Sequence, residues 1–146
     1  MRCLDLSLEK LDSETVKNAS VVALYVGMHT ATRIAIEALP RVKQFAPRAH
    51  VCVYGLYAPM NEALLRSLGV GTVLGGEVEP ALVSLCRRLR RDGAASAQTE
   101  PVTSLAKVRF EVPDRSGLPP LARYAHLVLP DGSTREIGRA SCRERV

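Results

Sequence analysis

The fold is decided by the stretch Val21-Val22-Ala23-Leu24-Tyr25-Val26, which is followed at once by Gly27-Met28-His29-Thr30. A short apolar run of this kind is typical of a buried strand, and the glycine that ends it is typical of a turn. Helical periodicity then continues from about Ala31 to Phe45, with Thr30 in the position of an N-cap. The stretch therefore predicts one βα unit.

The predicted helix carries its apolar residues on one face and a proline near its middle. The residues expected on the inner face are Ile34, Ala38, Leu39, Val42 and Phe45. Pro40 lacks a backbone donor, so it is predicted to kink the helix or to split it near Leu39.

The same order of strand, glycine turn and helix occurs twice more along the chain. The second unit is predicted as a strand over 50–54, a turn over 55–58 and a helix from Pro59 to Gly69. The third is predicted as a strand over 72–74, a Gly75-Gly76 turn and a helix from about Val78 to Arg91. Its apolar stripe comprises Leu82, Leu85, Cys86 and Leu89. Such units in series predict an α/β fold, a doubly wound, Rossmann-like parallel sheet with right-handed crossovers and helices on both faces.

The segments on either side of these units carry weaker signals. Before them, residues 2–6 are a candidate strand, and Ser13 is a candidate cap for a short helix through Asn18. After them, residues 92–104 are small and polar, which is typical of a linker. The elements expected farther on are strands over 107–112 and 126–129, a turn-rich loop over 113–120 and a turn over 130–133.

Length and composition are those of a small globular protein with one domain. The 146 residues are 47% hydrophobic and 24% charged, without an apolar run of the about 18 residues that a membrane helix needs. The first residues do not resemble a secretory signal, so a cytoplasmic location without a membrane partner is expected. The cysteines at positions 3, 52, 86 and 142 lack the spacing of zinc or redox motifs and are expected to stay reduced.

Much of the positive charge lies in the run Arg87-Arg88-Leu89-Arg90-Arg91 and in residues 136–146. The formal net charge of +5 could suggest an anionic partner. Many nucleic-acid-binding surfaces have aromatic residues interleaved with the basic ones, and this arginine run has none. The run is therefore interpreted as the solvated end of a helix, where the dipole favours cations, and no nucleic acid partner is expected.

Ligands in open parallel sheets bind outside the carboxyl ends of the strands, because loops and helix N-termini present backbone donors there. Glycine in the loops that follow the predicted strands would let the backbone approach a ligand closely. The candidate cofactor-binding residues are Gly27, Met28, His29, Thr30, Gly55, Leu56, Tyr57, Gly75, Gly76 and Glu77. Glycine after a strand is also ordinary turn chemistry, so these loops are either the walls of a binding site or plain turns. No glycine-rich nucleotide-binding motif is present.

His29 is the only histidine within these candidate loops. Its imidazole could act as an acid, a base or a ligand, or it could simply be satisfied by the backbone. Glu77 and Glu79 lie at the start of a predicted helix, where the dipole favours carboxylates whatever their role. No second acid or nucleophile lies beside them in the sequence, so no catalytic residue and no metal ligand is assigned.

At these loops the chain resembles a known family. The stretch Leu68-Gly69-Val70, continuing to Gly75-Gly76-Glu77 and Leu82, resembles the cobalamin-binding-type domain at the front of many radical S-adenosylmethionine (SAM) enzymes. The stretch Pro113-Asp114-Arg115-Ser116-Gly117-Leu118-Pro119-Pro120-Leu121, with Tyr124-Ala125-His126-Leu127, is similar to a connector into the radical SAM barrel. With Tyr54-Gly55-Leu56-Tyr57-Ala58-Pro59, the chain looks most like the CUAEP/CCAEP-tail radical SAM proteins, over about residues 2–134.

The resemblance implies that the candidate loop residues would surround a corrinoid, which makes cobalamin the expected small-molecule cofactor. The DxHxxG motif, whose histidine replaces a cobalt ligand in many such domains, is missing, and His29 does not match it. Cobalamin would then bind without a histidine ligand. The CxxxCxxC motif that holds an iron–sulfur ([4Fe-4S]) cluster beside SAM is also missing. The iron–sulfur cluster and SAM are therefore assigned to the parent enzyme alone. The parent's radical SAM barrel is the expected protein partner.

The resemblance also implies that both ends of the domain are cut. Residues 1–92 would be a partial cobalamin-binding-like domain, and residues 93–135 a linker and connector toward an absent barrel. Residues 136–146 match the in-frame translation of a common short-read sequencing adapter and are interpreted as non-native. A missing first strand would lie between residues 2–6 and 21–26, and its loss would expose a sheet edge. The expected function is that of a fragment of a radical SAM protein without a complete active site.

Two other functions are compatible with the residues. A small stand-alone doubly wound binding or receiver-like regulatory domain would need an acidic pair after its first strand, where Asp5 is alone. A small α/β enzyme acting through His29 lacks a partner residue. Flanking DNA that continued into CxxxCxxC would favour the fragment, whereas a stop codon after Val146 with no upstream strand would favour a stand-alone domain.

Overall fold

The computed structural model of the chain describes residues 2–93, 98–109, 112, 119–120, 123 and 126–136. It divides into two units, one of residues 11–112 and the other of residues 1–10 with 113–146. The first unit contains the predicted βα repeats. Most of the predicted loop over 113–120 and the predicted tail beyond residue 136 lie outside the described residues.

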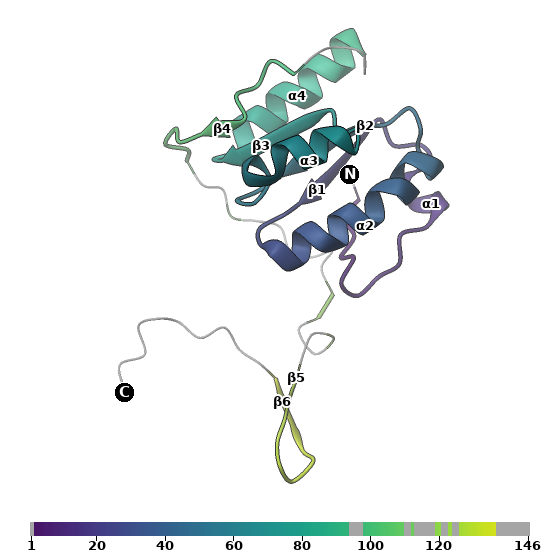
Figure 1. Cartoon of the computed structure of the whole chain (residues 1–146), viewed down its shortest axis with the longest axis vertical. Helices are drawn as coiled ribbons and strands as arrows, with labels where there is room; N and C mark the ends of the chain where they lie inside the picture. The colour runs from purple at the N-terminus through teal and green to yellow at the C-terminus, as the bar shows by residue number, and fades with distance from the viewer. Residues whose placement is uncertain are drawn as a thin grey trace. The chain divides into compact units, whose positions relative to one another are not determined.

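The first unit is built on a parallel sheet (Figure 1). Its strands are β1 (Val21–Tyr25), β2 (His50–Tyr54), β3 (Thr72–Gly76) and β4 (Thr103–Ser104), in the order β1-β2-β3-β4. The register pairs Tyr25 with Tyr54 and Tyr54 with Leu74, so the strands end at one edge. The predicted fold class, a parallel α/β sheet flanked by helices, is confirmed.

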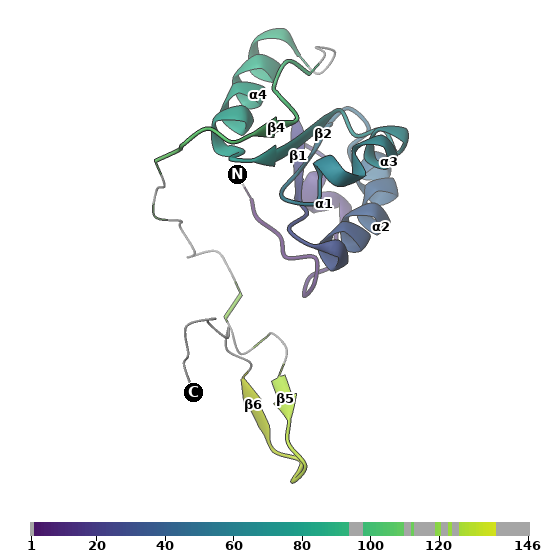
Figure 2. The ribbon, with the colours of Figure 1, turned by 60° about the vertical axis from the view of Figure 1, so that its left-hand side comes forward.

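Helices cover both faces of this sheet. α2 (His29–Phe45), the 3-10 turn η1 (Pro59–Asn61) and α3 (Glu62–Ser67) lie on one face, and α4 (Glu79–Asp92) lies on the other (Figure 1 and Figure 2). The core under α4 contains Cys52, Leu74 and Leu85, all almost fully buried, whereas alternate positions on the same strands, such as Val53 and Val73, face the opposite side. The chain is thus doubly wound, as predicted. Among the described helices, none combines the length and apolar character required to cross a bilayer.

The last crossover differs from the first two in hand. Strand order increases steadily from β1 to β4, yet α2 and α3 cross on one face and α4 on the other. Connections that move in the same direction over opposite faces have opposite hands. Because nearly all such connections in proteins are right-handed, the exception is the one through α4, and the prediction of right-handed crossovers is wrong for this connection. Its strand, β4, has only 2 residues and is an edge addition rather than a core strand.

Residues 98–104, which we call the strap, were predicted as part of a linker but run along the outer edge of β3. Val102 O accepts a hydrogen bond from Gly75 N at 2.6 Å, and Ser104 O accepts one from Glu77 N at 2.8 Å. The Gln98 side chain extends this ladder, since its amide accepts from Val73 N and donates to Val73 O, both at 3.1 Å. The Gln98 side-chain amide thus forms the hydrogen bonds that the backbone of a neighbouring strand residue would form. The composition of this segment does not predict such a role.

α2 corrects two expectations. It begins at His29 after Met28, which makes no side-chain cap, so Thr30 lies inside the helix rather than at its N-cap. Instead, Thr32 Oγ1 donates to Met28 O at 3.0 Å. Pro40 does not split the helix, which continues to Phe45, and the kink that was the other expectation stays a prediction. Pro40 is exposed, so its ring does not have to be accommodated in the core.

The N-terminal segment also differs from the sequence expectations. Residues 2–6 form no strand; Asp5 Oδ1 instead accepts from Ser7 N at 2.9 Å and from Ser7 Oγ at 2.6 Å in a turn. The short helix α1 (Ser13–Val16) is capped by Asp12, whose carboxylate accepts from Thr15 N, and not by Ser13.

The second unit contains one antiparallel hairpin. β5 (His126–Val128) pairs with β6 (Thr134–Glu136), and the turn between them is closed by Leu129 N donating to Ser133 O at 2.8 Å. The strand predicted over 126–129 and the turn over 130–133 are therefore confirmed. The strand predicted over 107–112 is not formed by residues 107–109 or 112, and residues 110–111 lie outside the described part.

Candidate functional site

The candidate loops follow strands that end at the same edge of the sheet. Tyr57 N donates to Val26 O at 3.1 Å, which joins the loop after β2 to the end of β1. Gly55 N donates to Leu74 O at 3.0 Å, which joins it to β3. The sheet thus places the loops over 27–30, 55–57 and 75–77 side by side along its carboxyl edge, where parallel sheets bind ligands.

The glycines of these loops lie against the chain's own atoms. A Cβ added at Gly27 would meet the Tyr25 ring, and one at Gly55 would meet Val26 O at 2.8 Å. A Cβ at Gly75 would meet the Pro59 ring, and one at Gly76, whose φ is +71°, would meet Ser104 O. Close packing against backbone atoms or the Pro59 ring therefore accounts for Gly55, Gly75 and Gly76, whereas Gly27 meets only the end of the exposed Tyr25 side chain.

The polar residues of the candidate loops do not form a cluster of possible metal ligands. His29 is exposed at the first turn of α2, and Glu77 uses its backbone amide to hold the strap. Throughout the part of the chain that the structure describes, no three His, Cys, Asp or Glu side chains are grouped as a metal site would require.

The carboxyl edge carries an aromatic pair that the sequence analysis missed. Tyr25 and Tyr54 are the last residues of β1 and β2, paired in register, with ring centroids 5.5 Å apart and planes tilted by 50°. Tyr25 is 63% exposed, and Met28 and Leu56 beside it in the loops are also largely exposed. A tyrosine at the last position of each of two adjacent strands was the signal that could have predicted this pair.

A buried ion pair was also missed, because the arginine run was interpreted as solvated. Arg88 is 7% exposed, and its guanidinium donates to both carboxylate oxygens of Glu100 in the strap, through Nε at 3.2 Å and Nη2 at 2.8 Å. Arg88 follows Leu85 by three positions, so it shares the inward face of α4. Cys86, predicted in the apolar stripe, is instead exposed.

Cys52 and Glu100 have shifted pKa values for different reasons. Burial, with smaller contributions from Cys86 and Glu100, raises the pKa of the Cys52 thiol to about 12, which keeps it protonated and unreactive. Burial alone would also raise the pKa of Glu100. Hydrogen bonds from Arg88 and from the backbone, with the Arg88 charge, outweigh burial and hold the pKa of Glu100 below its ordinary value. The ion pair is therefore charged at neutral pH.

Two cavities of the first unit are lined by residues outside the candidate loops. One, of about 590 Å³, lies beside α4, and the other, of about 850 Å³, lies at the amino ends of β1 and β2 around Ser20, Val21 and Ala49. None of the candidate loop residues lines either cavity. Neither of these two cavities is therefore the site predicted at the carboxyl edge, where the exposed Tyr25 ring offers a ligand a surface. Comparison of the chain with protein-family models, curated proteins and solved structures found no match.

Proposed function

We propose that this chain is the cobalamin-binding-like domain of a radical SAM protein, and that the carboxyl edge of its sheet is the ligand-binding surface. The observation that carries the proposal is the exposed Tyr25 ring, which contacts the Tyr54 ring at the ends of two parallel strands, with the exposed Met28 and Leu56 in the loops that follow these strands. An aromatic and apolar surface of this kind favours a flat, largely apolar ligand.

The residues at this edge suit a corrinoid in one respect and differ from the usual arrangement in another. The Tyr25 ring, Met28 and Leu56 offer an apolar surface against which one face of a macrocycle can pack. The glycines are already packed against protein atoms, so the loops would hold the ring by surface contact and not by a deep backbone cradle. When bound, the corrinoid would supply cobalt-centred chemistry to the parent enzyme. The residues of this chain would bind and orient it.

The receiver-like alternative has no supporting observation. Asp5 is held in a local turn by Ser7, and the residues that follow β1 and β2 begin with Val26 and Gly55 rather than with a carboxylate. An enzyme acting through His29 would need a partner for the imidazole, and the ion pairs found among the described residues do not include His29.

The test is retention of corrinoids by the full chain on gel filtration, followed by the visible spectrum. Both hydroxocobalamin and cyanocobalamin are used, because only the former readily exchanges a ligand for an adventitious thiol or imidazole. We expect both to be retained, and we expect Tyr25→Ser to weaken retention of both. Val83→Ser is the matched control, since Val83 is an exposed apolar residue of α4. Absence of retention and of spectral change, or retention equal in wild type and Tyr25→Ser, would overturn the proposal.

A further inference from the structure

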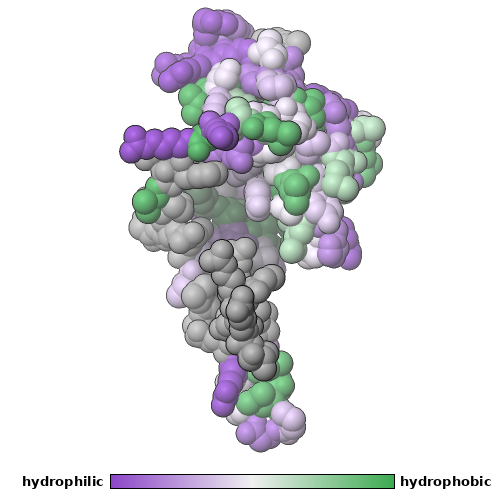
Figure 3. Space-filling view, turned by 90° about the vertical axis from the view of Figure 1, so that its left-hand side faces the viewer, coloured by the Kyte–Doolittle hydropathy of each residue, from purple (hydrophilic) through white to green (hydrophobic). Residues whose placement is uncertain are grey.

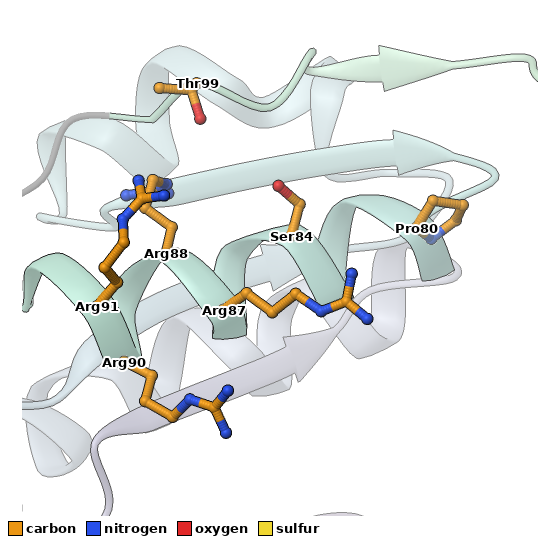
Figure 4. A pocket seen from close by; sticks show the side chains of 7 residues that line it. All are labelled: Pro80, Ser84, Arg87, Arg88, Arg90, Arg91 and Thr99. Atoms are coloured by element: carbon orange, nitrogen blue, oxygen red, sulfur yellow. The ribbon is translucent and has the colours of Figure 1, made fainter.

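A groove beside α4 is lined by positive and hydroxyl-bearing side chains and by Pro80, and none of the candidate loop residues lines it. Its volume is about 590 Å³, and its walls include Arg87, Arg88, Arg90, Arg91, Ser84 and Thr99 (Figure 4). Thr99 belongs to the strap, so the groove is formed only when the strap lies along β3. Its lining includes four guanidinium groups and no carboxylate.

The arginines of the groove differ in how far their charge is already balanced. Arg88 is buried and paired with Glu100, and Arg91 is paired with Asp92 at 2.7 Å on the surface. Arg87 and Arg90 are exposed, and no acidic group of the described chain lies within 4.0 Å of either guanidinium. These two side chains extend from the outer side of α4, whereas Arg91 and the Ser84 hydroxyl are turned toward the side on which Thr99 lies (Figure 4).

The surface over this part of the molecule is strongly hydrophilic. The top of the space-filling view, where the C-terminal end of α4 lies in Figure 1, is covered mainly by hydrophilic side chains (Figure 3). An arginine whose charge has no partner is free to bind an anion, and its planar fork matches two oxygens of one phosphate.

The size and lining of the groove indicate the class of anion. Small-molecule sites in proteins are commonly about 300–1,000 Å³, so the groove exceeds what a single phosphate needs and can accept a chain of phosphates. Single-stranded nucleic acid usually needs aromatic side chains on which bases stack, and none lines the groove. We propose that this groove binds the polyphosphate group of a small molecule, such as a nucleoside diphosphate or triphosphate, through Arg87 and Arg90.

The test is titration calorimetry of the full chain with inorganic tripolyphosphate, ATP and a single-stranded oligothymidylate. We expect tripolyphosphate and ATP to bind, and the double variant Arg87→Ala/Arg90→Ala to weaken both by about tenfold or more, the loss expected for charge-assisted hydrogen bonds. Raising the salt concentration should weaken binding, because exposed charges are screened.

The control is Arg33→Ala/Arg41→Ala, which removes the same charge from exposed positions of α2. We expect it to bind tripolyphosphate like the wild type, so a general loss of charge is separated from loss of the groove. Equal weakening in the two double variants, or no binding by the wild type, would overturn the proposal. Tighter binding of the oligothymidylate than of tripolyphosphate, lost in Arg87→Ala/Arg90→Ala, would overturn the assignment to a small molecule. Circular dichroism establishes that both variants are folded.

Discussion

Arg88 of α4 and Glu100 of the strap form a buried, two-point ion pair that connects a helix on one face of the sheet to the segment at its edge. The two side chains are 7% and 2% exposed, and the Nη2 to Oε2 distance is 2.8 Å. The pair lies next to the core that contains Cys52 and Leu85, so its charges have little access to water. It holds in place a short strand whose crossover has the less common hand.

Removing one partner of this pair is expected to be strongly destabilising. Arg88→Met leaves the Glu100 carboxylate buried without its guanidinium, and the free energy of unfolding should fall by about 3 kcal/mol. Urea denaturation followed by circular dichroism measures the change. The double variant Arg88→Met/Glu100→Leu should recover much of the loss, since two apolar side chains need no partner. A double variant no more stable than Arg88→Met would contradict this account.

The same pair makes stability depend on acid pH. The pKa of Glu100 is lower in the folded protein than in the unfolded chain, so the stabilisation is complete above the ordinary carboxyl pKa of 4.5. It is lost as the pH falls through the lower, folded-state pKa. The free energy of unfolding of the wild type should therefore fall more steeply below pH 4.5 than that of Glu100→Gln. Parallel curves for the two proteins would show that Glu100 does not contribute.

Gly76 is expected to tolerate no side chain, because the strap backbone occupies the space beside it. Gly76→Ala combines a positive φ with a clash against Ser104 O, so it should displace β4 and speed proteolysis within the strap. Gly69→Ala is the matched control. Gly69 has a φ of +76° but meets only the flexible end of Lys43, so the variant should lose about 1 kcal/mol and keep the strap protected. Equal proteolysis of the two variants would argue against close packing at Gly76.

Cysteine reactivity should separate the buried thiol from the exposed ones. Cys52 is fully buried, and burial raises its pKa to about 12, whereas Cys3 and Cys86 are exposed. Iodoacetamide at pH 8 should modify Cys3 and Cys86 in the folded protein and leave Cys52 unmodified until urea is added. Mass spectrometry of the digested protein assigns each site. Modification of Cys52 at the rate of Cys86 without denaturant would mean that the core around Leu74 opens readily.

The βα core could be predicted from sequence because its signals are local. Both ends of the strand over 50–54 were predicted correctly, because the apolar run between Ala49 and Gly55 is typical of a buried strand. The third strand and its helix differed from their predicted bounds by only one or two residues. Helix periodicity and glycine turns carry this information within each unit, without reference to the rest of the chain.

The position of the strap depends on contacts between distant residues, which explains why the sequence did not reveal it. Gln98 hydrogen bonds to Val73, and Glu100 pairs with Arg88, although both lie in a small, polar segment that is typical of a linker. The charge of Arg88 suggested that its side chain is exposed to solvent. Its burial is favourable only because a carboxylate from another segment pairs with it. The candidate loops were located at the correct edge, but the glycines within them turned out to be packed against Tyr25, Pro59 and Ser104.

Every second backbone amide from Val73 to Glu77 donates a hydrogen bond to the strap, so the docking of the strap can be measured separately from the unfolding of the sheet. Val73 N, Gly75 N and Glu77 N all donate to the strap, through Gln98 Oε1, Val102 O and Ser104 O. Their deuterium uptake therefore reports how often the strap detaches while the rest of the sheet stays intact. Since an edge strand of this kind can open without global unfolding, these amides should exchange as one group, and sooner than those of β2.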